Sequence, residues 1–360
     1  MPNDSITVRE GIVLFKGKLS RNLLLEPIVS NVYVIEDGEE IIIFDFSCGR
    51  KIAKRIENHI RHRSKEKGGW AKANLLAGHS HLDHANNFYL SDVIGAAETN
   101  IYVHENGFNN GKVMNHPMRF IENSVKEANK YYNFYLSFPF PYNLLMYFFV
   151  VMDKLYPAAA RKIFALTGCI PWPAPADGKV KPKALKNSDT EVINIGNIEV
   201  KGWKIGSKII FSTSGHSPCS VSLYWPELKA LFISDADWLG NPVFISSSLK
   251  ESIASLEKMM ALTEAGFVEL LLPAHGDPIE GRDQILTHLR FRISLLEAMR
   301  EEIKAAYRRY GEEKDVTKLT EILAQVSPFF KILKIINYPR HVFFVNNAVA
   351  VCLREEGILS

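Results

Sequence analysis

The sequence predicts an α/β protein with two β-rich halves, each of which carries helices. Residues 6–46 contain short runs of Val, Ile and Phe broken by Gly and Asp, which is typical of strands and turns. A helical stretch follows over 50–63, with isoleucines on one stripe and Lys or Arg around it. A second strand-rich stretch covers 190–235, and a helix is expected over 248–265. Two such halves predict two packed sheets with helices outside.

The composition is that of an ordinary soluble globular protein of 360 residues, with 47% apolar and 23% charged side chains. A formal net charge of +3 gives no reason by itself to expect a nucleic-acid partner. The first residues lack a basic stretch followed by an apolar run, so no secretory leader is expected. The four cysteines form no Cys-x-x-Cys pair, which predicts a reducing, cytoplasmic setting. These are Cys48, Cys169, Cys219 and Cys352.

Residues of metal-binding type crowd into one short segment. His79, His81, Asp83 and His84 fall within six residues, directly after the apolar run 73–77. In an extended loop, residues i and i+2 point to the same side, so His79 and His81 can share one ion. Asp83 and His84 come where the chain turns toward a helix, so they can face a second position. Imidazole and carboxylate together suit zinc and similar divalent ions.

Three further candidates, His216, Asp235 and His275, each lie in a loop after a predicted strand. Ligands converge on a scaffold at such strand ends. Gly215 and Gly276 lie beside the two histidines and permit the tight turns that aim a ring inward. Together with the first segment, these residues predict a metal site of five histidines and two aspartates. The other histidines lack this context and are expected to be structural: His59, His62, His104, His116, His288 and His341.

The order of these residues resembles the motif series of the metallo-β-lactamase superfamily. That series is His-x-His-x-Asp-His, then Gly-His, then an Asp after an apolar strand, then Ala-His-Gly, and the match covers 6–107 and 190–280. The resemblance implies a four-layer αββα sandwich, and it implies that Asp45 orders the histidine loop. It also implies the metal ligands: His79, His81 and His216 for the first ion, Asp83, His84 and His275 for the second, and Asp235 bridging both.

The resemblance further implies a metal-dependent hydrolase with two divalent ions. Zinc is the expected metal, and iron and manganese are the alternatives. A hydroxide held between the ions would attack a carbonyl or phosphoryl centre, and Asp83 is placed to receive or return a proton. Asp235 stands where many true β-lactamases carry Cys or Ser, which disfavours antibiotic hydrolysis. Trp238 stands where bacterial quorum lactonases tend to have Tyr, which disfavours a lactonase of that kind. The first motif has no Glu in place of a histidine, which disfavours the flavodiiron oxidoreductases.

An aromatic-rich insertion over 108–185 separates the two halves. Its apolar run 144–152 is far shorter than the roughly 20 residues that span a bilayer, so no transmembrane segment is expected. We expect the insertion to form a helical cap beside the metal site. Buried packing, a homodimer contact and a membrane-surface element are the alternatives. The residues expected to contact substrate are Trp238, Tyr135, Tyr142, Phe138 and Phe148.

Residues 281–360 are predicted to form a helical extension to a metallo-β-lactamase-fold domain over 1–280. The pattern indicates a long charged helix over 285–310, a second helix near Asp315, and a short last helix closed by Gly357. This layout is similar to the small winged-helix-like tail of the β-lactamase-like protein 2 group, some members of which act on RNA.

The favoured function is hydrolysis of an ester-like bond in a small molecule with an apolar part: a thioester, a lactone or a carboxylic ester. The first alternative is a phosphodiesterase or ribonuclease. Its main support is the basic stretch 50–67, although a charged helix face is usually only solvated. The second alternative is an iron-dependent sulfur dioxygenase. The third is a non-catalytic binding module. The intact ligand set disfavours it, because a binding module need not keep all seven ligands.

Overall fold

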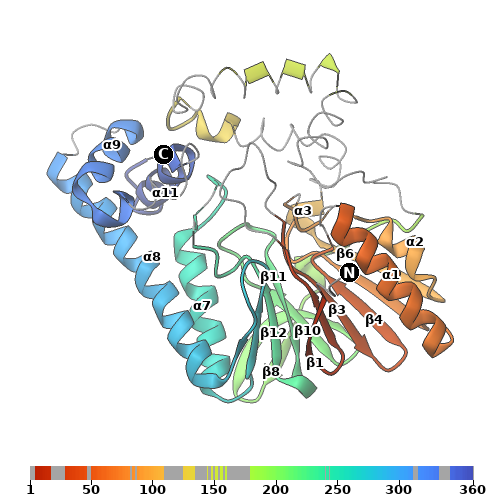
Figure 1. Ribbon diagram of the computed structural model, residues 1–360. Helices are drawn as coiled ribbons and strands as arrows, with labels where there is room; N and C mark the ends of the chain where they lie inside the picture. The colour runs from red at the N-terminus through yellow and green to blue at the C-terminus, as the bar shows by residue number, and fades with distance from the viewer. Residues whose placement is uncertain are drawn as a thin grey trace.

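The strands and helices form four layers in the computed structural model (Figure 1). The model describes residues 5–17, 29–46, 50–81, 83–85, 87–108, 125–133, 179–239, 241–242, 244–310, 315–331 and 341–359, together with 144, 147, 148, 151, 152, 155, 156 and 159.

The first sheet has seven strands that follow the chain order from edge to edge. Neighbours up to β4 are antiparallel, and β4, β5, β6 and β7 run parallel to one another. The strands are β1 (Ser5–Arg9), β2 (Ile12–Phe15), β3 (Val32–Asp37), β4 (Glu40–Phe44), β5 (Lys72–Leu76), β6 (Glu98–His104) and β7 (Lys183–Leu185).

The second sheet also has seven strands in consecutive order, and all neighbours are antiparallel except the parallel pair β12 and β13. Its strands are β8 (Glu191–Ile195), β9 (Ile198–Ile205), β10 (Lys208–Ser212), β11 (Val221–Trp225), β12 (Ala230–Ser234), β13 (Leu270–Pro273) and β14 (Ile279–Glu280).

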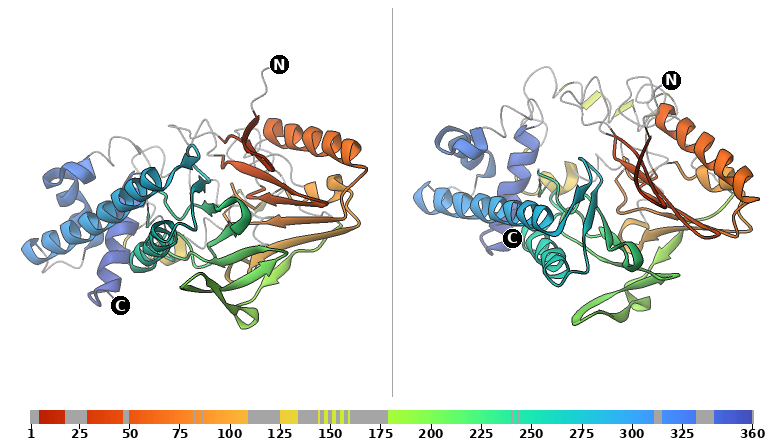
Figure 2. Two further views of the ribbon diagram at one scale, coloured as in Figure 1. Left: turned by 90° about the horizontal axis from the view of Figure 1, so that it is seen from below. Right: turned by 60° about the horizontal axis from the view of Figure 1, so that its bottom comes forward.

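Helices cover the outer faces of both sheets, with α1 and α2 on the first and α7 and α8 on the second (Figures 1 and 2). The described helices are α1 (Arg50–Lys67), α2 (Leu90–Ile94), α3 (Glu105–Phe108), α7 (Leu249–Glu264), α8 (Arg282–Tyr310), α9 (Val316–Val326) and α11 (His341–Glu355). The side chain of Ser248 caps α7, and the side chain of Asp315 caps α9. No helix within the described ranges has the length and apolar character that crossing a membrane requires.

Three hydrophobic clusters fill the spaces between the four layers. On β4, Ile41 and Ile43 pack toward α1, whereas Ile42 and Phe44 face the second sheet. Because successive residues of a strand point to opposite faces, this apolar run fills two clusters at once. The Phe232 ring meets the Phe44 ring at 5.7 Å between the sheets. The expected αββα sandwich is therefore confirmed.

The helices after residue 281 continue the cluster on the outer face of the second sheet. Buried residues of α8, α9 and α11 join those of α7 and of the sheet in one apolar cluster. Each element described in this extension is a helix, and the winged-helix resemblance and the boundary at 280 stay predictions. Two of the four cysteines, Cys219 and Cys352, are buried free thiols. Cys48 and Cys169 lie outside the described residues.

Part of the aromatic insertion packs on the C-terminal helix. Tyr132 is buried with Val125 and Ala128, and its hydroxyl donates to the amide oxygen of Asn347 on α11 at 2.8 Å. Phe148 is 51% exposed. Tyr135, Phe138 and Tyr142 lie outside the described residues, so a cap that presents aromatic rings to the site stays a prediction.

Candidate metal centre

The seven predicted ligands lie in four loops that each follow a strand. The loop after β5 carries His79, His81, Asp83 and His84, and the loops after β10, β12 and β13 carry the other three. β5 belongs to the first sheet and the other three strands to the second. The site therefore lies where the loops of both sheets meet.

Two strained residues shape the ends of β4 and β12. Asp45 has a φ of 56° and Ser234 a φ of 48°, the left-handed region that non-glycine residues rarely adopt. Their side chains bond each other, since the Ser234 hydroxyl donates to Asp45 Oδ2 at 2.8 Å. The backbone N–H of Gly78 donates to Asp45 Oδ1 at 2.8 Å. A Cβ on Gly78 would lie 2.4 Å from Ser234 Cβ, so the approach of the histidine loop to Ser234 requires glycine.

The first group of donors comprises His79, His81, His216 and Asp235, whose ligand atoms lie within 4.8 Å of one another. His216 Nε2 is 3.1 Å from His81 Nδ1 and 3.3 Å from Asp235 Oδ2. His79 Nε2 is 3.7 Å from the same Asp235 oxygen. Two ligands of one tetrahedral zinc ion lie about 3.4 Å apart when each bond is about 2.1 Å. The spacing therefore suits a single ion.

The second group comprises Asp83, His84 and His275. Asp83 Oδ2 lies 3.3 Å from His84 Nε2 and 3.4 Å from His275 Nε2. Asp235 reaches this group as well, because its Oδ2 is 3.3 Å from His84 Nε2 and its Oδ1 is 3.3 Å from His275 Nε2. Asp235 is thus the side chain that touches donors of both groups.

Outer hydrogen bonds leave the inward nitrogens of three histidines with free lone pairs. His84 Nδ1 donates to Asp45 Oδ2 at 3.0 Å, and His216 Nδ1 donates to Asn241 Oδ1 at 2.6 Å. Ser234 gives its own proton to Asp45, so its oxygen accepts from His79 Nδ1 at 3.1 Å. A ring that donates through Nδ1 presents Nε2 as an electron-pair donor, the form in which imidazole binds a metal.

Several inward atoms in this site lack hydrogen-bond partners within the described part of the chain. His79 Nε2, His84 Nε2 and Asp235 Oδ1 are buried and unpaired in this sense. A buried polar atom without a partner costs about 1–3 kcal/mol, so such atoms at one point indicate an absent group. Imidazole nitrogens and a carboxylate fit zinc, iron or manganese. The residues present therefore fit a divalent metal pair.

Electrostatics in the site also favour bound cations. Burial lowers the pKa of His79 well below its usual value and that of His81 to about 3, so both rings are neutral. Burial opposes a high pKa for His84, but Asp235, Asp83 and Asp45 outweigh it and raise that pKa well above the usual value. These carboxylates therefore favour a positive charge at His84, which a proton on the ring can supply. A metal ion would supply that positive charge instead.

Asp83 is more accessible to solvent than Asp235 and His84. Its side chain is 25% exposed, whereas that of Asp235 is 6% exposed and that of His84 fully buried. Burial would raise the pKa of the Asp83 carboxyl, but His84 and His275 hold it well below its usual range. Asp83 is therefore an ionised carboxylate at the open side of the site.

The structural comparisons identify the architecture. A search of family models and of curated proteins finds no match to this sequence. Solved structures do match. One is a metallo-beta-lactamase family protein from Thermus thermophilus, with 16% identity, a TM-score of 0.57, and coverage of 98% of this chain and 95% of that one. Another is a beta-lactamase domain protein from Burkholderia ambifaria, with 16% identity, a TM-score of 0.54, and coverage of 98% and 88%. The chain has the metallo-β-lactamase fold.

Within this metallo-β-lactamase fold, backbone-binding side chains that the sequence analysis missed hold the ligand loops. Asn31 Nδ2 donates to the carbonyls of Pro273 at 3.0 Å and Gly276 at 2.8 Å, on either side of His275. The hydroxyl of Ser30 donates to the carbonyl of Asp83. Each partner lies far away in the sequence, so no local motif could reveal these contacts.

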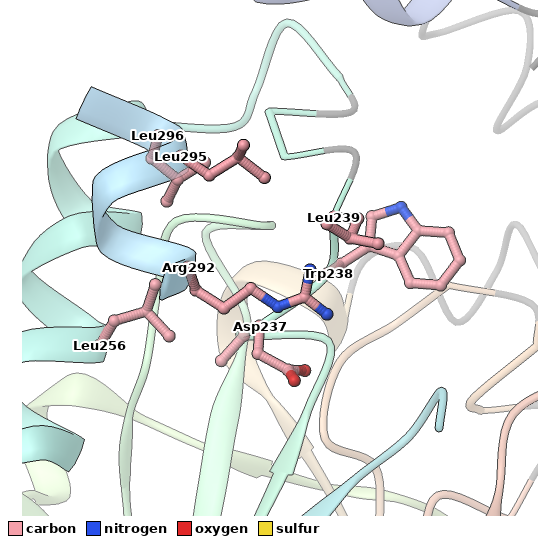
Figure 3. Close-up of a pocket in the computed structure, with 8 residues that line it drawn as sticks. Asp237, Trp238, Leu239, Leu256, Arg292, Leu295 and Leu296 are labelled. Carbon is pink, nitrogen blue, oxygen red and sulfur yellow. The ribbon is translucent and has the colours of Figure 1, made fainter. Parts of the chain in front are cut away.

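Two further contacts explain residues beside the centre. The rings of Trp238 and His275 pack edge to face, with 4.6 Å between ring centroids. Asp237 accepts a hydrogen bond from His288 Nε2 on α8 at 2.7 Å, so His288 holds the loop that carries Asp235. Figure 3 shows the Asp237 carboxylate below the guanidinium of Arg292, and the Trp238 indole directed away from the leucines of α8. His288 is thus structural, as expected.

The remaining histidines without metal-type context also have other partners where they are described. His59 lies 3.4 Å from Glu36, His62 lies 3.3 Å from Glu66, and His104 Nε2 lies 3.2 Å from Asn187 Oδ1. His116 and the side chain of His341 lie outside the described residues.

We expect Ser234→Ala to weaken metal binding about 10- to 100-fold, the usual cost of losing a partner that orients a ligand. The hydroxyl contacts His79, His84 and Asp45 at once, so its loss removes a partner from two ligand rings. Chelator competition with Zn²⁺ measures the affinity. Ser222→Ala is the matched control, because Ser222 is equally buried but bonds Thr213. Equal affinities for the two variants would contradict this role.

Proposed function

We propose that the chain is a binuclear metal-dependent hydrolase. The observation that carries this proposal is the set of seven converging donors, several of them buried and unpaired, at the loop edge of a metallo-β-lactamase fold. In this proposal His79, His81 and His216 hold the first ion. Asp83, His84 and His275 would hold the second, and Asp235, which lies beside donors of both groups, would bind both. Zinc is the favoured metal, because borderline imidazole and carboxylate donors suit it, with iron and manganese as alternatives.

The chain's own residues divide the chemical work. When bound, two divalent ions supply a nucleophile made from water at neutral pH and an electrophile for the substrate oxygen. Asp45 and Asn241 fix the rings of His84 and His216, and Asp45 also fixes Ser234 beside His79. Asp83 contacts both histidines of its group through Oδ2, which leaves Oδ1 to hold a proton for the leaving group.

Aromatic rings beside both donor groups support an ester-like substrate with an apolar part. Phe244 lies against His81 with 4.8 Å between ring centroids, and Trp238 lies against His275. Both aromatic side chains are half-buried, so each offers an apolar face next to the centre. Thioesters, lactones and carboxylic esters combine such an apolar part with an electrophilic carbonyl. We therefore propose this class as the substrate.

The basic helix α1 gives the nuclease alternative less support where its cations are already paired with acidic side chains. Arg63 binds Glu36 at 2.7 Å and Glu66 at 2.6 Å, and Arg61 binds Glu57 at 2.9 Å. Burial alone would raise the pKa of Glu36, but His59, Arg63 and Lys67 outweigh this effect and hold the pKa well below its usual range. A cation engaged in such a pair has less charge to offer a phosphate backbone.

A substrate panel tests the proposal and gives a further prediction. We expect hydrolysis of thioesters or carboxylic esters, with KM falling as the acyl chain lengthens, and little cleavage of bis-nitrophenyl phosphate. Phe244→Ala and Trp238→Ala should raise KM for long chains about 10-fold, since each ring buries roughly 1.5–3 kcal/mol of apolar contact. Metal analysis of the purified chain accompanies the kinetics.

Arg61→Glu tests the nuclease alternative, because it reverses one charge of α1 and leaves the Arg63–Glu36 pair intact. It should leave ester turnover unchanged. The chain could instead cleave phosphodiesters or RNA but no ester, and lose that activity in Arg61→Glu. This result would overturn the proposed function in favour of a nuclease.

A further inference from the structure

The last turn of α11 contacts a segment beside the candidate metal centre. Glu355 Oε1 accepts from the Ser248 hydroxyl at 2.7 Å and from the N–H of Leu249 at 2.9 Å. Its Oε2 accepts from the N–H of Lys250 at 3.2 Å. The first N–H groups of a helix have no partner within it, and the N-terminal end carries partial positive charge. Glu355 therefore binds the start of α7 by hydrogen bonds and by charge.

The neighbouring residue, Arg354, binds the chain just before α7. Its guanidinium donates to the carbonyl of Ile245 at 2.6 Å and to that of Ser247 at 3.0 Å. Both residues are buried and lie outside the sheets and helices, so their carbonyls depend on a side chain for these bonds. The two charged residues at the end of α11 thus contact five of the six positions 245–250.

The same segment also contacts the loop of His216. Ser247 donates its hydroxyl to the His216 carbonyl at 2.7 Å, and the N–H of Ser248 donates to the carbonyl of Gly215 at 2.8 Å. A few residues earlier, Asn241 accepts from His216 Nδ1 at 2.6 Å. Gly215 has a φ of 138°, and a Cβ there would lie 2.4 Å from the backbone nitrogen of Ser252 on α7. The loop of His216 is therefore built directly on this segment and on α7.

We propose that Arg354 and Glu355 are positioning residues for the first metal site, acting through the segment 241–250 on the ring of His216. This inference rests on the proposed function, since it assumes that the first donor group binds an ion. A shift of the segment would move the Asn241 amide and the Ser247 hydroxyl together, and His216 Nε2 would leave its place beside His81 and Asp235. The C-terminal helix is then part of the machinery that shapes the site.

Adjacent residues of α11 provide a matched control. Glu356 directs its carboxylate to Arg300 of α8, which donates from Nε at 2.8 Å. Glu356→Gln therefore loosens α11 from α8 in a position next to Glu355. If α11 served only to stabilise the fold, Glu355→Gln and Glu356→Gln would have the same consequences for the metal site.

The experiment compares the full-length chain with Glu355→Gln, Arg354→Met, Arg354→Lys and Glu356→Gln. Zn²⁺ affinity is measured by competition with a chromophoric chelator, and donor geometry by the visible absorption of the Co²⁺-loaded protein. Hydrogen exchange of the metal-free chain reports on the peptide that covers 241–250. We expect Glu355→Gln and Arg354→Met to weaken the binding of one of the two Zn²⁺ ions about 10- to 100-fold and to alter the Co²⁺ spectrum. They should also speed exchange in that peptide.

Arg354→Lys keeps a single charged donor nitrogen, so it should retain part of the Zn²⁺ affinity that Arg354→Met loses. Glu356→Gln should lower the thermal midpoint while leaving Zn²⁺ affinity within about 2-fold of the parent. Unchanged affinity and spectrum in Glu355→Gln and Arg354→Met would overturn the inference, as would equal weakening in Glu356→Gln. A parent chain that binds no metal would instead overturn the proposed function, which separates the two failures.

Discussion

Replacing Asp235 with alanine is expected to release at least one metal ion and to reduce hydrolysis by about 10³-fold or more, a loss of several kcal/mol of charge stabilisation. The reason is geometric. Its two oxygens lie 3.3 Å from His84, His216 and His275, so the variant removes a donor from both groups at once. It also removes the carboxylate that lies beside the buried rings of His79 and His216.

Metal content per chain and kcat are measured on the same Asp235→Ala preparation. Asp237→Asn is the matched control, because Asp237 lies two residues away and binds His288 on α8. The control should retain both ions. A variant lacking the Asp235 carboxylate that kept both ions and full activity would contradict the bridging role.

Asp83→Asn is expected to lower kcat by about 10²- to 10⁴-fold while most of the metal stays bound. Asparagine keeps an oxygen in the place of the ligand atom but cannot accept or return a proton. Asp83 is also partly exposed, so it can reach a leaving group that the buried Asp235 cannot. Steady-state kinetics and metal analysis of the variant measure the two effects separately. A fall in activity only in proportion to lost metal would show that Asp83 is merely a ligand.

Elements with strong local patterns could be predicted from the sequence. The strands β2, β4, β12 and β13 are short apolar runs that end at turn residues, and buried strands between two layers require such runs. The helix expected over 248–265 begins and ends within a residue of α7, because Ser248 supplies a strong N-cap. The fold class is confirmed on this basis.

Weaker patterns escaped prediction. The strand β7 has three residues, Lys183–Leu185, and within the described residues it pairs with β6 alone, so its sequence carries little information. The strand β14 has only two residues, so its sequence also carries too little information to predict it.

The candidate site divides in a similar way. His79, His81, Asp83 and His84 form a local motif, so spacing alone could place them together. The residues that orient the site could not be found by spacing. Asn31 bonds residues more than 240 positions away, and Glu355 bonds Ser248 across 107 positions. Such contacts depend on how the layers pack, and a single sequence shows no periodicity for them.

Each donor group draws on both sheets, and this affects how the protein unfolds. His79 and His81 come from the first sheet's loop and His216 from the second sheet, while Asp83 and His84 meet His275 in the same way. Neither half of the chain carries all the donors of either group. If both groups bind ions as proposed, opening the sandwich and releasing the ions are one thermodynamic event. The free concentration of metal consequently becomes a determinant of folding free energy, worth about 2.7 kcal/mol per ion at 100 times its dissociation constant.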